Sequence, residues 1–179
     1  MEKDKKGTLY IVGTPIGNLG DITIRAIETL KSVDVILAED TRQTLKLLNH
    51  FNIQKHLVSY HRHNEDEKIK NVVDFLDSGK DLALVSDAGM PVISDPGQNL
   101  IKYLVANNYN IVTIPGVTAV ITAIVKSGLD STRFTFEGFL SINKKQRKQR
   151  LESLKNEERT MVFYEAPHKL RSTLEDMLK

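Results

Sequence analysis

Three polar residues stand where they could take a proton from a substrate. Asp40, His61 and Asp87 each follow the end of an apolar, β-branched run within two residues. A carboxylate or a neutral imidazole in such a position can act as a general base, which accelerates a reaction by about 10²–10⁴-fold. We therefore take these three as catalytic candidates. Two other roles stay open for Asp87: a turn carboxylate that accepts backbone N–H groups, or a contact to a bound cofactor.

The other two candidates also have structural alternatives. Asp40 stands where an N-cap would be expected, and its carboxylate would then accept backbone N–H groups of the helix that follows. His61 and His63 follow a strand, and one of them could face a site as a base or an RNA contact while the other is a surface histidine. No carboxylate or third histidine with ligand spacing accompanies them, so the sequence predicts no metal site.

Turns rich in glycine and proline follow three apolar runs. They read VGTPIG, SDAGMP and IPGVTA. Each holds a glycine that would let the backbone approach a ligand closely: Gly13, Gly89 and Gly116. None is a P-loop, because no Gly-Lys-Ser/Thr follows. A single turn of this kind would be weak support for a site, and three together favour one.

The composition of these turns indicates the kind of ligand. No Lys or Arg lies within Gly13–Gly20, Ser86–Pro91 or Pro115–Ala119, although a phosphate-rich ligand would favour such charge. The side chains are small and apolar, with hydroxyl groups at Thr14, Ser86 and Thr118 and carboxylates at Asp87 and Asp95. This lining suits a ligand with amide, ribose and adenine character, with room for a cation, and it does not suit a nucleoside triphosphate.

The elements that must position these residues alternate along the chain. Helical periodicity separates five apolar runs, so the pattern predicts an α/β fold with a largely parallel five-stranded sheet. The carboxyl ends of parallel strands lie on one edge, where the three turns would meet. The predicted strands are Leu9–Val12, Val33–Ala38, Leu57–Tyr60, Leu82–Ser86 and Ile111–Ile114.

Two helices have clear sequence signals. The first is predicted over Asn64–Ser78, with Gly79 as its C-terminal stop. The second begins at SDPGQ, where Asp95 can cap the helix and Pro96 suits the first turn. Its predicted buried residues are Leu100, Ile101, Leu104 and Val105.

The pattern restarts after residue 130. A strand is predicted over Phe134–Leu140, a basic helix over Lys144–Asn156, a strand over Thr160–Ala166, and a last helix from His168. Two strands are too few to close a second sheet. We therefore expect an N-terminal α/β domain over residues 1–130 and an incomplete second α/β domain over residues 131–179.

Composition narrows the class of protein. The 179 residues carry a net charge of +2 and no cysteine, which excludes disulfides and thiolate metal sites. No apolar run approaches the roughly 18 residues that would cross a bilayer. Seven Lys/Arg against three Glu gather within Ser141–Arg159. This run is either a solvated helix face or a patch for an anionic partner such as nucleic acid.

At these motifs the sequence resembles the tetrapyrrole (corrin/porphyrin) methylase superfamily. The resemblance spans nearly the whole chain in the family's order. The matching stretches are GTLYIVGTPIGNLGDIT, AEDTR, SYHRHNE, LVSDAGMPVISDPG, IPGVTA, FEGFL and FYEAPHKL. It is nearest to the branch that methylates a cytidine ribose 2′-hydroxyl in 16S ribosomal RNA. Small-molecule members typically have Gly-Gly-Asp-Pro where this chain has AGMP, and they lack SYHRHNE.

The resemblance implies a two-domain protein, usually a homodimer, that binds S-adenosylmethionine between its domains. The family's cofactor-binding positions fall here on Pro15, Ala88, Gly89, Met90, Ile93, Thr118 and Ala119, with one more at Glu165 or Ala166. The remaining family contact falls beyond Lys179. We therefore expect this chain alone to hold an incomplete site and to bind the cofactor weakly.

The absence of cysteine fits a reducing cytoplasm, and the resemblance implies an enzyme that acts on 16S rRNA of the small ribosomal subunit. Basic side chains are the candidates for RNA phosphate contacts: Arg42, Arg62, Lys144, Lys145 and Arg147. For Arg42 a solvent position is an equal alternative. Tyr60 is a candidate for stacking on a base, or else a core residue. Two other functions stay open: methylation of a small tetrapyrrole, and a noncatalytic RNA-binding module.

Overall fold

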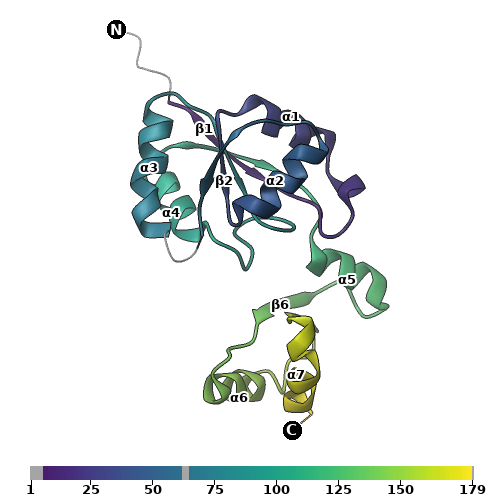
Figure 1. The fold of residues 1–179 in the computed structure, drawn as a ribbon. Coiled ribbons are helices and arrows are strands. Elements are labelled where there is room, and N and C mark those ends of the chain that lie inside the picture. The colour runs from purple at the N-terminus through teal and green to yellow at the C-terminus, as the bar shows by residue number, and fades with distance from the viewer. Residues whose placement is uncertain (1–5, 62–64, 179) are drawn as a thin grey trace. The chain divides into compact units, whose positions relative to one another are not determined.

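The computed structural model describes residues 6–61 and 65–178, which divide into two compact units (Figure 1). The first runs to Ala119, and the second begins at Val120. The helix α5 (Ala119–Ser127) therefore groups with the second unit. The boundary expected from the sequence, at residue 130, lies just after this helix. Each unit has a sheet of its own.

The first unit contains a five-stranded sheet in the order β3-β2-β4-β1-β5, and every pair in it is parallel. The predicted α/β fold is therefore confirmed, with each predicted strand present within two residues of its expected ends. The strands are β1 (Thr8–Val12), β2 (Val35–Ala38), β3 (His56–Ser59), β4 (Leu82–Val85) and β5 (Asn110–Ile114).

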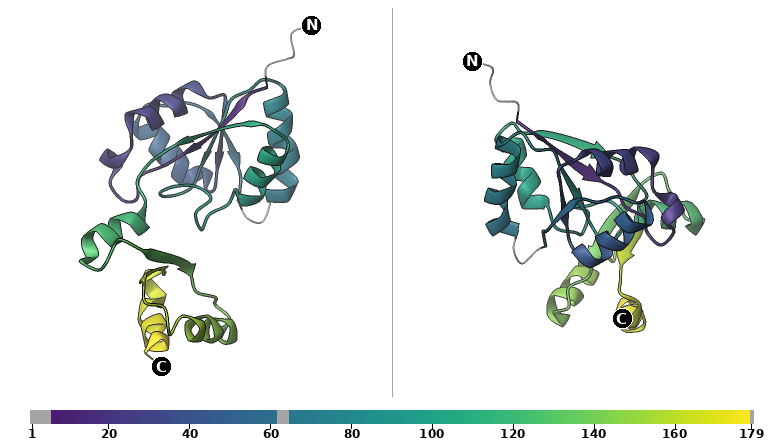
Figure 2. Two further views of the ribbon diagram at one scale, coloured as in Figure 1. Left: turned by 180° about the vertical axis from the view of Figure 1, so that it is seen from behind. Right: turned by 45° about the horizontal axis from the view of Figure 1, so that its top comes forward.

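Helices cover both faces of this sheet (Figure 2). One face packs against α1 (Ile24–Ser32) and α2 (Thr41–His50). The other packs against α3 (Glu65–Asp77) and α4 (Gln98–Ala106). All four residues of β2 and of β4 are buried, because these central strands have helices on both sides. Strands of this kind read as continuous apolar runs, which made them predictable.

Helix α4 begins later than the sequence predicts. Its N-cap is Gly97, and the predicted cap, Asp95, lies two residues before it. Gly97 has a φ of 123°, and a Cβ there would lie 2.8 Å from a methyl group of Leu84. This position favours glycine, so the cap of α4 makes no side-chain hydrogen bond. Val105, predicted to be buried, is 62% exposed.

The second unit has two parallel strands, β6 (Phe134–Phe139) and β7 (Thr160–Tyr164). Two further helices follow the strands: α6 (Lys144–Ser153) after β6, and α7 (Leu170–Met177) after β7. Short 3₁₀ turns lie at Leu19–Asp21 in the first unit and at Pro167–Lys169 before α7. No helix in the described ranges has the length and apolar character that crossing a membrane requires.

Candidate functional site

The centre of the first sheet contains a topological switch point. Strands β1 and β4 are neighbours, but the chain leaves β1 toward β2 on one side and leaves β4 toward β5 on the other. In open parallel sheets, ligands bind outside the carboxyl ends of the strands at such a point. The turns that follow β1 and β4 are therefore the expected location of a site.

Backbone hydrogen bonds join these two turns. The N–H of Thr14 donates to the carbonyl of Gly89 at 2.9 Å, and the N–H of Gly89 donates to the carbonyl of Thr14 at 3.0 Å. The buried hydroxyl of Thr14 also donates to the carbonyl of Ser86 at 3.2 Å. These bonds fix the turn after β1 against the turn after β4.

The third turn, after β5, meets the first at two glycines. A Cβ on Gly13 would lie 2.8 Å from the Cα of Gly116 and 2.8 Å from the Sδ of Met90. A Cβ on Gly116 would in turn lie 2.9 Å from the Cα of Gly13. Such distances leave no room for a side chain at either position. The predicted convergence of the three turns is therefore confirmed.

The segment after β4 holds two residues in an unusual backbone conformation. Val92 has a φ of 76° and Ser94 a φ of 66°. A positive φ is rare outside glycine, and for a β-branched residue such as Val92 it costs on the order of 1–3 kcal/mol. Strain of this size gathers at binding and active sites. The sequence does not reveal this feature, because valine is a residue that ordinarily avoids the conformation.

The residues expected to bind the cofactor in the first unit lie in or beside the three turns. Ala88, Ile93 and Ala119 are exposed, Met90 and Thr118 are half-buried, and Pro15 and Gly89 are buried. No charged side chain belongs to this set. The exposed members leave apolar and backbone groups open to a ligand, and the buried ones hold the turns in place.

Two of the catalytic candidates are in contact. The Oδ1 of Asp87 accepts a hydrogen bond from the backbone N–H of Asp40 at 3.1 Å. Although Asp87 is exposed as a whole, partial loss of hydration raises the pKa of its carboxyl, and the charge of Asp40 acts in the same direction. A raised pKa makes a carboxylate a better proton acceptor.

Asp40 has a different environment. Its carboxylate accepts from the backbone N–H of Arg42 at 2.8 Å and from the Arg42 side chain at 3.0 and 2.7 Å. These bonds lower the pKa of Asp40 to about 2, the side-chain bond most strongly. Asp40 also caps α2, which is the structural alternative that the sequence leaves open for this residue. The carboxylate is thus a structural cap with little tendency to take up a proton.

The third catalytic candidate, His61, is half-buried just beyond the edge strand β3. Asp40 follows β2, which is a direct neighbour of β4, whereas His61 follows β3, which lies on the far side of β2. His61 is therefore one strand farther from β4 than Asp40 is. Tyr60 is fully buried, so the alternative in which it stacks on a base is wrong. Arg62 and His63 lie outside the described residues.

The basic helix α6 divides into exposed and buried cations. Lys144 and Lys145 are exposed, as a nucleic-acid contact requires. Arg147 is 9% exposed, and its guanidinium donates to Ser141, Thr173 and Asp176 within the second unit. The expectation that Arg147 faces an RNA phosphate is therefore corrected: its donors are occupied inside the protein.

The candidate turn of the second unit follows β7. The Oε1 of Glu165 accepts from the N–H of Ala166 at 2.8 Å, and the Oε2 accepts from the Thr173 hydroxyl at 2.6 Å. The bond from Thr173 is the main cause of a lowered pKa at Glu165. Both carboxylate oxygens are thus bound within the protein.

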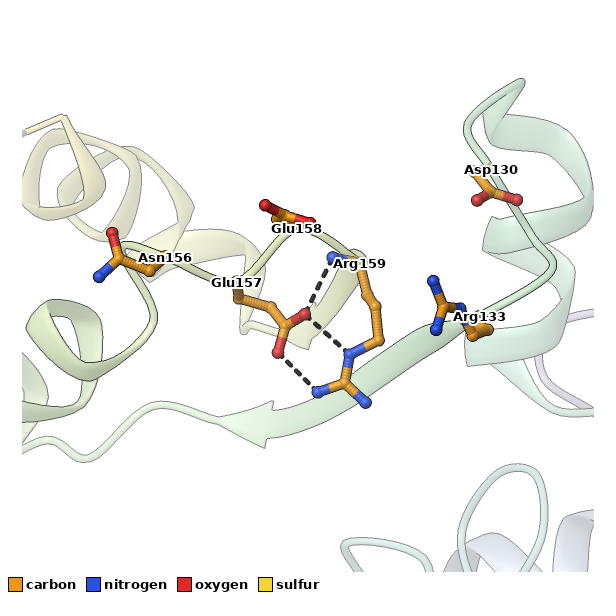
Figure 3. Close-up of a pocket in the computed structure, with 6 residues that line it drawn as sticks. All are labelled: Asp130, Arg133, Asn156, Glu157, Glu158 and Arg159. Carbon is orange, nitrogen blue, oxygen red and sulfur yellow. Dashed lines mark hydrogen bonds and ion pairs between the residues drawn. The ribbon is translucent and has the colours of Figure 1, made fainter.

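A separate hollow of about 370 Å³ lies at the other end of β6 and β7 (Figure 3). It is lined by Asp130, Arg133, Asn156, Glu157, Glu158 and Arg159. Glu157 accepts two hydrogen bonds from the side chain of Arg159, which lower the pKa of Glu157 to about 2. The hollow mixes both signs of charge. No cluster of metal-binding side chains occurs in residues 6–61 and 65–178.

Comparison with known sequences gives a family match over nearly the whole chain. Residues 8–179 match the family described as Tetrapyrrole (Corrin/Porphyrin) Methylases. A relative from Halalkalibacterium halodurans, named Ribosomal RNA small subunit methyltransferase I, is 55% identical over 99% of this chain and 62% of its own length. A relative of the same name from Thermotoga maritima is 51% identical over 97% of this chain and 78% of its own length.

Comparison with solved structures shows the same fold. A cobalt precorrin-4 methyltransferase aligns with a TM-score of 0.70 at 18% identity, over 96% of this chain and 74% of that one. A diphthine synthase aligns with a TM-score of 0.70 at 15% identity, over 96% and 71%. The chain spans about three fifths of the length of the relatives from H. halodurans, Synechocystis and Bacillus subtilis.

Proposed function

The chain belongs to the tetrapyrrole (corrin/porphyrin) methylase family, and from this premise we propose that it is part of an S-adenosylmethionine-dependent rRNA methyltransferase. Its proposed reaction is methylation of a cytidine ribose 2′-hydroxyl in 16S rRNA of the small ribosomal subunit. Relatives that are 50–55% identical are named for ribosomal RNA methylation, which supports this substrate class. We further propose that it acts in the cytoplasm as a homodimer.

The observation that carries the proposal is the joining, at the switch point, of three turns that contain no Lys or Arg. The contact between Gly13 and Gly116 brings two turns together at the backbone, and no cation lies among the lining residues. These features fit an adenosyl sulfonium, because this ligand has no phosphate groups and so needs no cationic side chains to neutralise them. We propose as its contacts Pro15, Ala88, Gly89, Met90, Ile93, Thr118 and Ala119, together with Glu165 or Ala166.

S-adenosylmethionine supplies an activated methyl group, so the protein's main tasks are alignment and exclusion of water. A ribose hydroxyl is a weak nucleophile at neutral pH, and we assign Asp87 to accept its proton. The raised pKa of Asp87 favours this role over Asp40, whose pKa is about 2. His61 stays the alternative base.

Phosphate contacts are assigned to exposed cations. Lys144 and Lys145 present exposed ammonium groups on α6. The Arg42 side chain is 87% exposed while paired with Asp40. Arg62, outside the described residues, is kept as a further candidate. Such contacts position an RNA without reading its sequence.

Transfer of a radiolabelled methyl group tests the proposal. Full-length protein is given the labelled donor and, in turn, immature small ribosomal subunits, naked ribosomal RNA and uroporphyrinogen. Label on the ribose of a cytidine after digestion to nucleosides is the expected result. Label in the tetrapyrrole alone, or in no substrate, would overturn it and point to a small-molecule methylase or to a noncatalytic module.

A further inference from the structure

Arg147 ties together three parts of the second unit. Its Nε donates to the carbonyl of Ser141 at 3.2 Å, in the loop before α6. Its Nη1 donates to the Thr173 hydroxyl at 3.1 Å and to the Asp176 carboxylate at 3.2 Å, both on α7. A guanidinium is a planar fork, so partners on several sides fix its orientation.

Thr173 extends this contact to the turn after β7. Its hydroxyl accepts from Arg147 and donates to the Oε2 of Glu165 at 2.6 Å. The Nη2 of Arg147 lies 4.0 Å from the same carboxylate oxygen. The Glu165 side chain is 11% exposed, so this charge is largely removed from solvent. The carboxylate is therefore held from one side by α6 and α7.

The other side of the Glu165 carboxylate holds the backbone of Ala166. Oε1 accepts the Ala166 N–H at 2.8 Å, and the Ala166 carbonyl accepts from the N–H of Lys169 at 2.9 Å. Ala166 thus retains two groups for a ligand: its methyl group and the second lone pair of its carbonyl. Each Glu165 oxygen also accepts one hydrogen bond, but the Glu165 side chain is only 11% exposed, so its remaining lone pairs are largely withheld from a ligand.

Resting on the proposed function, we propose that Arg147 is a positioning residue for the methyl donor. Through Thr173 and Glu165 it fixes the backbone of Ala166, and Ala166 makes the contact to the donor. Of the two neighbouring candidates in this turn, Glu165 is therefore a support and Ala166 is the ligand. The basic residue that the sequence suggests for RNA serves the cofactor turn instead.

Hydrogen exchange of the Ala166 amide, measured by NMR on full-length protein without ligand, tests the positioning. In Arg147→Met we expect this exchange to accelerate by about tenfold or more, as for loss of a hydrogen bond to a charged group. The β7 amides that pair with β6 should stay protected. Arg171→Met is the matched control, because it removes an exposed arginine paired with Glu175 on α7, and it should leave Ala166 unchanged.

A second variant covers the case in which Arg147→Met unfolds the unit. Thr173→Val removes the relaying hydroxyl at nearly constant volume and keeps the arginine. If the β7 amides lose their protection from exchange in Arg147→Met, the exchange rate of the Ala166 amide in Thr173→Val tests the proposal instead. Unchanged exchange at Ala166 in a variant whose β7 stays protected would overturn the proposal.

Calorimetric titration of the full-length protein with S-adenosylhomocysteine tests the link to the cofactor. We expect Arg147→Met and Glu165→Gln each to weaken binding by about tenfold, and the double variant by no more than either, because both act on one contact. Additive losses, or weakened binding in Glu165→Gln with normal exchange at Ala166, would make Glu165 the ligand and overturn the assignment. If the parent protein fails to bind, the proposed function fails, while the exchange result stands.

Discussion

At the residue scale, the carboxylates of Asp40 and Asp87 differ in how their oxygens are used. Asp40 accepts three hydrogen bonds from Arg42, whereas Asp87 accepts one from the Asp40 backbone. The first carboxylate is stabilised in its charged form, and the second is made more basic by partial burial. The sequence places both at one edge of the sheet, but their hydrogen-bond partners decide their chemistry.

The first prediction concerns Asp87→Asn. We expect kcat to fall by about 10²–10⁴-fold, because the amide cannot take a proton, while binding of S-adenosylhomocysteine stays near that of the parent. In the parent, kcat should decline as pH drops through the raised pKa of Asp87, and this decline should be absent from the residual activity of the variant. A pH–rate profile measures both effects.

Asp40→Asn is the control for this experiment. Asparagine is also a good N-cap, so α2 should remain capped and the methylation rate should change little. A loss in Asp40→Asn as large as that in Asp87→Asn would contradict the assignment of Asp87 as the base.

The second prediction concerns Lys144 and Lys145. Replacing both with alanine should weaken RNA binding and should lower the slope of log K against log salt by up to about 2, one for each phosphate that the variant no longer neutralises. Fluorescence anisotropy with an rRNA fragment at several salt concentrations measures the slope. Arg171→Ala, which removes an exposed cation on α7, should leave the slope unchanged.

At the scale of elements, burial on two faces made the strands predictable, and local backbone geometry made the helix ends less so. Strand β4 reads as an unbroken apolar run because helices cover both its faces. The start of α4 was misplaced because Gly97 needs a positive φ, which the capping signal at Asp95 does not show. Arg147 was misassigned because α6 is rich in exposed cations, and a single buried arginine among them does not produce a recognisable sequence pattern.

The third prediction concerns the contact between two turns. Gly13→Ala should destabilise the protein by about 1–3 kcal/mol, because the new methyl group meets the backbone of Gly116, which cannot move aside like a side chain. It should also weaken S-adenosylhomocysteine binding. Gly20→Ala is the control: its Cβ would lie 3.3 Å from the end of the Asn18 side chain, and we expect a change within about 0.5 kcal/mol. Urea denaturation measures both variants.

At the scale of the molecule, the two units differ in how completely they bury apolar surface. The first has a core on each face of a five-stranded sheet. The second has two strands and leaves large apolar side chains exposed on its helices: Ile121, Val125, Leu170 and Leu174. A two-stranded sheet is at best marginally stable in water. The first unit therefore has what independent folding needs, and the second does not.

The fourth prediction follows from this difference. A fragment ending at Ala119 should unfold in one cooperative urea transition, with an m-value of about 1–3 kcal/mol/M. A fragment of residues 120–179 should lack such a transition. Circular dichroism at increasing urea concentration measures both. A cooperative transition in the shorter fragment would show that its exposed apolar residues are not a barrier to folding.

The position of β1 between two strands that come much later in the chain has a consequence for synthesis of the chain. Its neighbours are β4 and β5: the Thr8 amide bonds Asp81, 73 residues later, and the Thr8 side chain bonds Asn110, 102 residues later. Strand β1 therefore has no partner until most of the unit has emerged from the ribosome. Until then the apolar residues of β1 are exposed to solvent. A protein that we propose to act on ribosomes would therefore depend on chaperones at the ribosome while it is being synthesised.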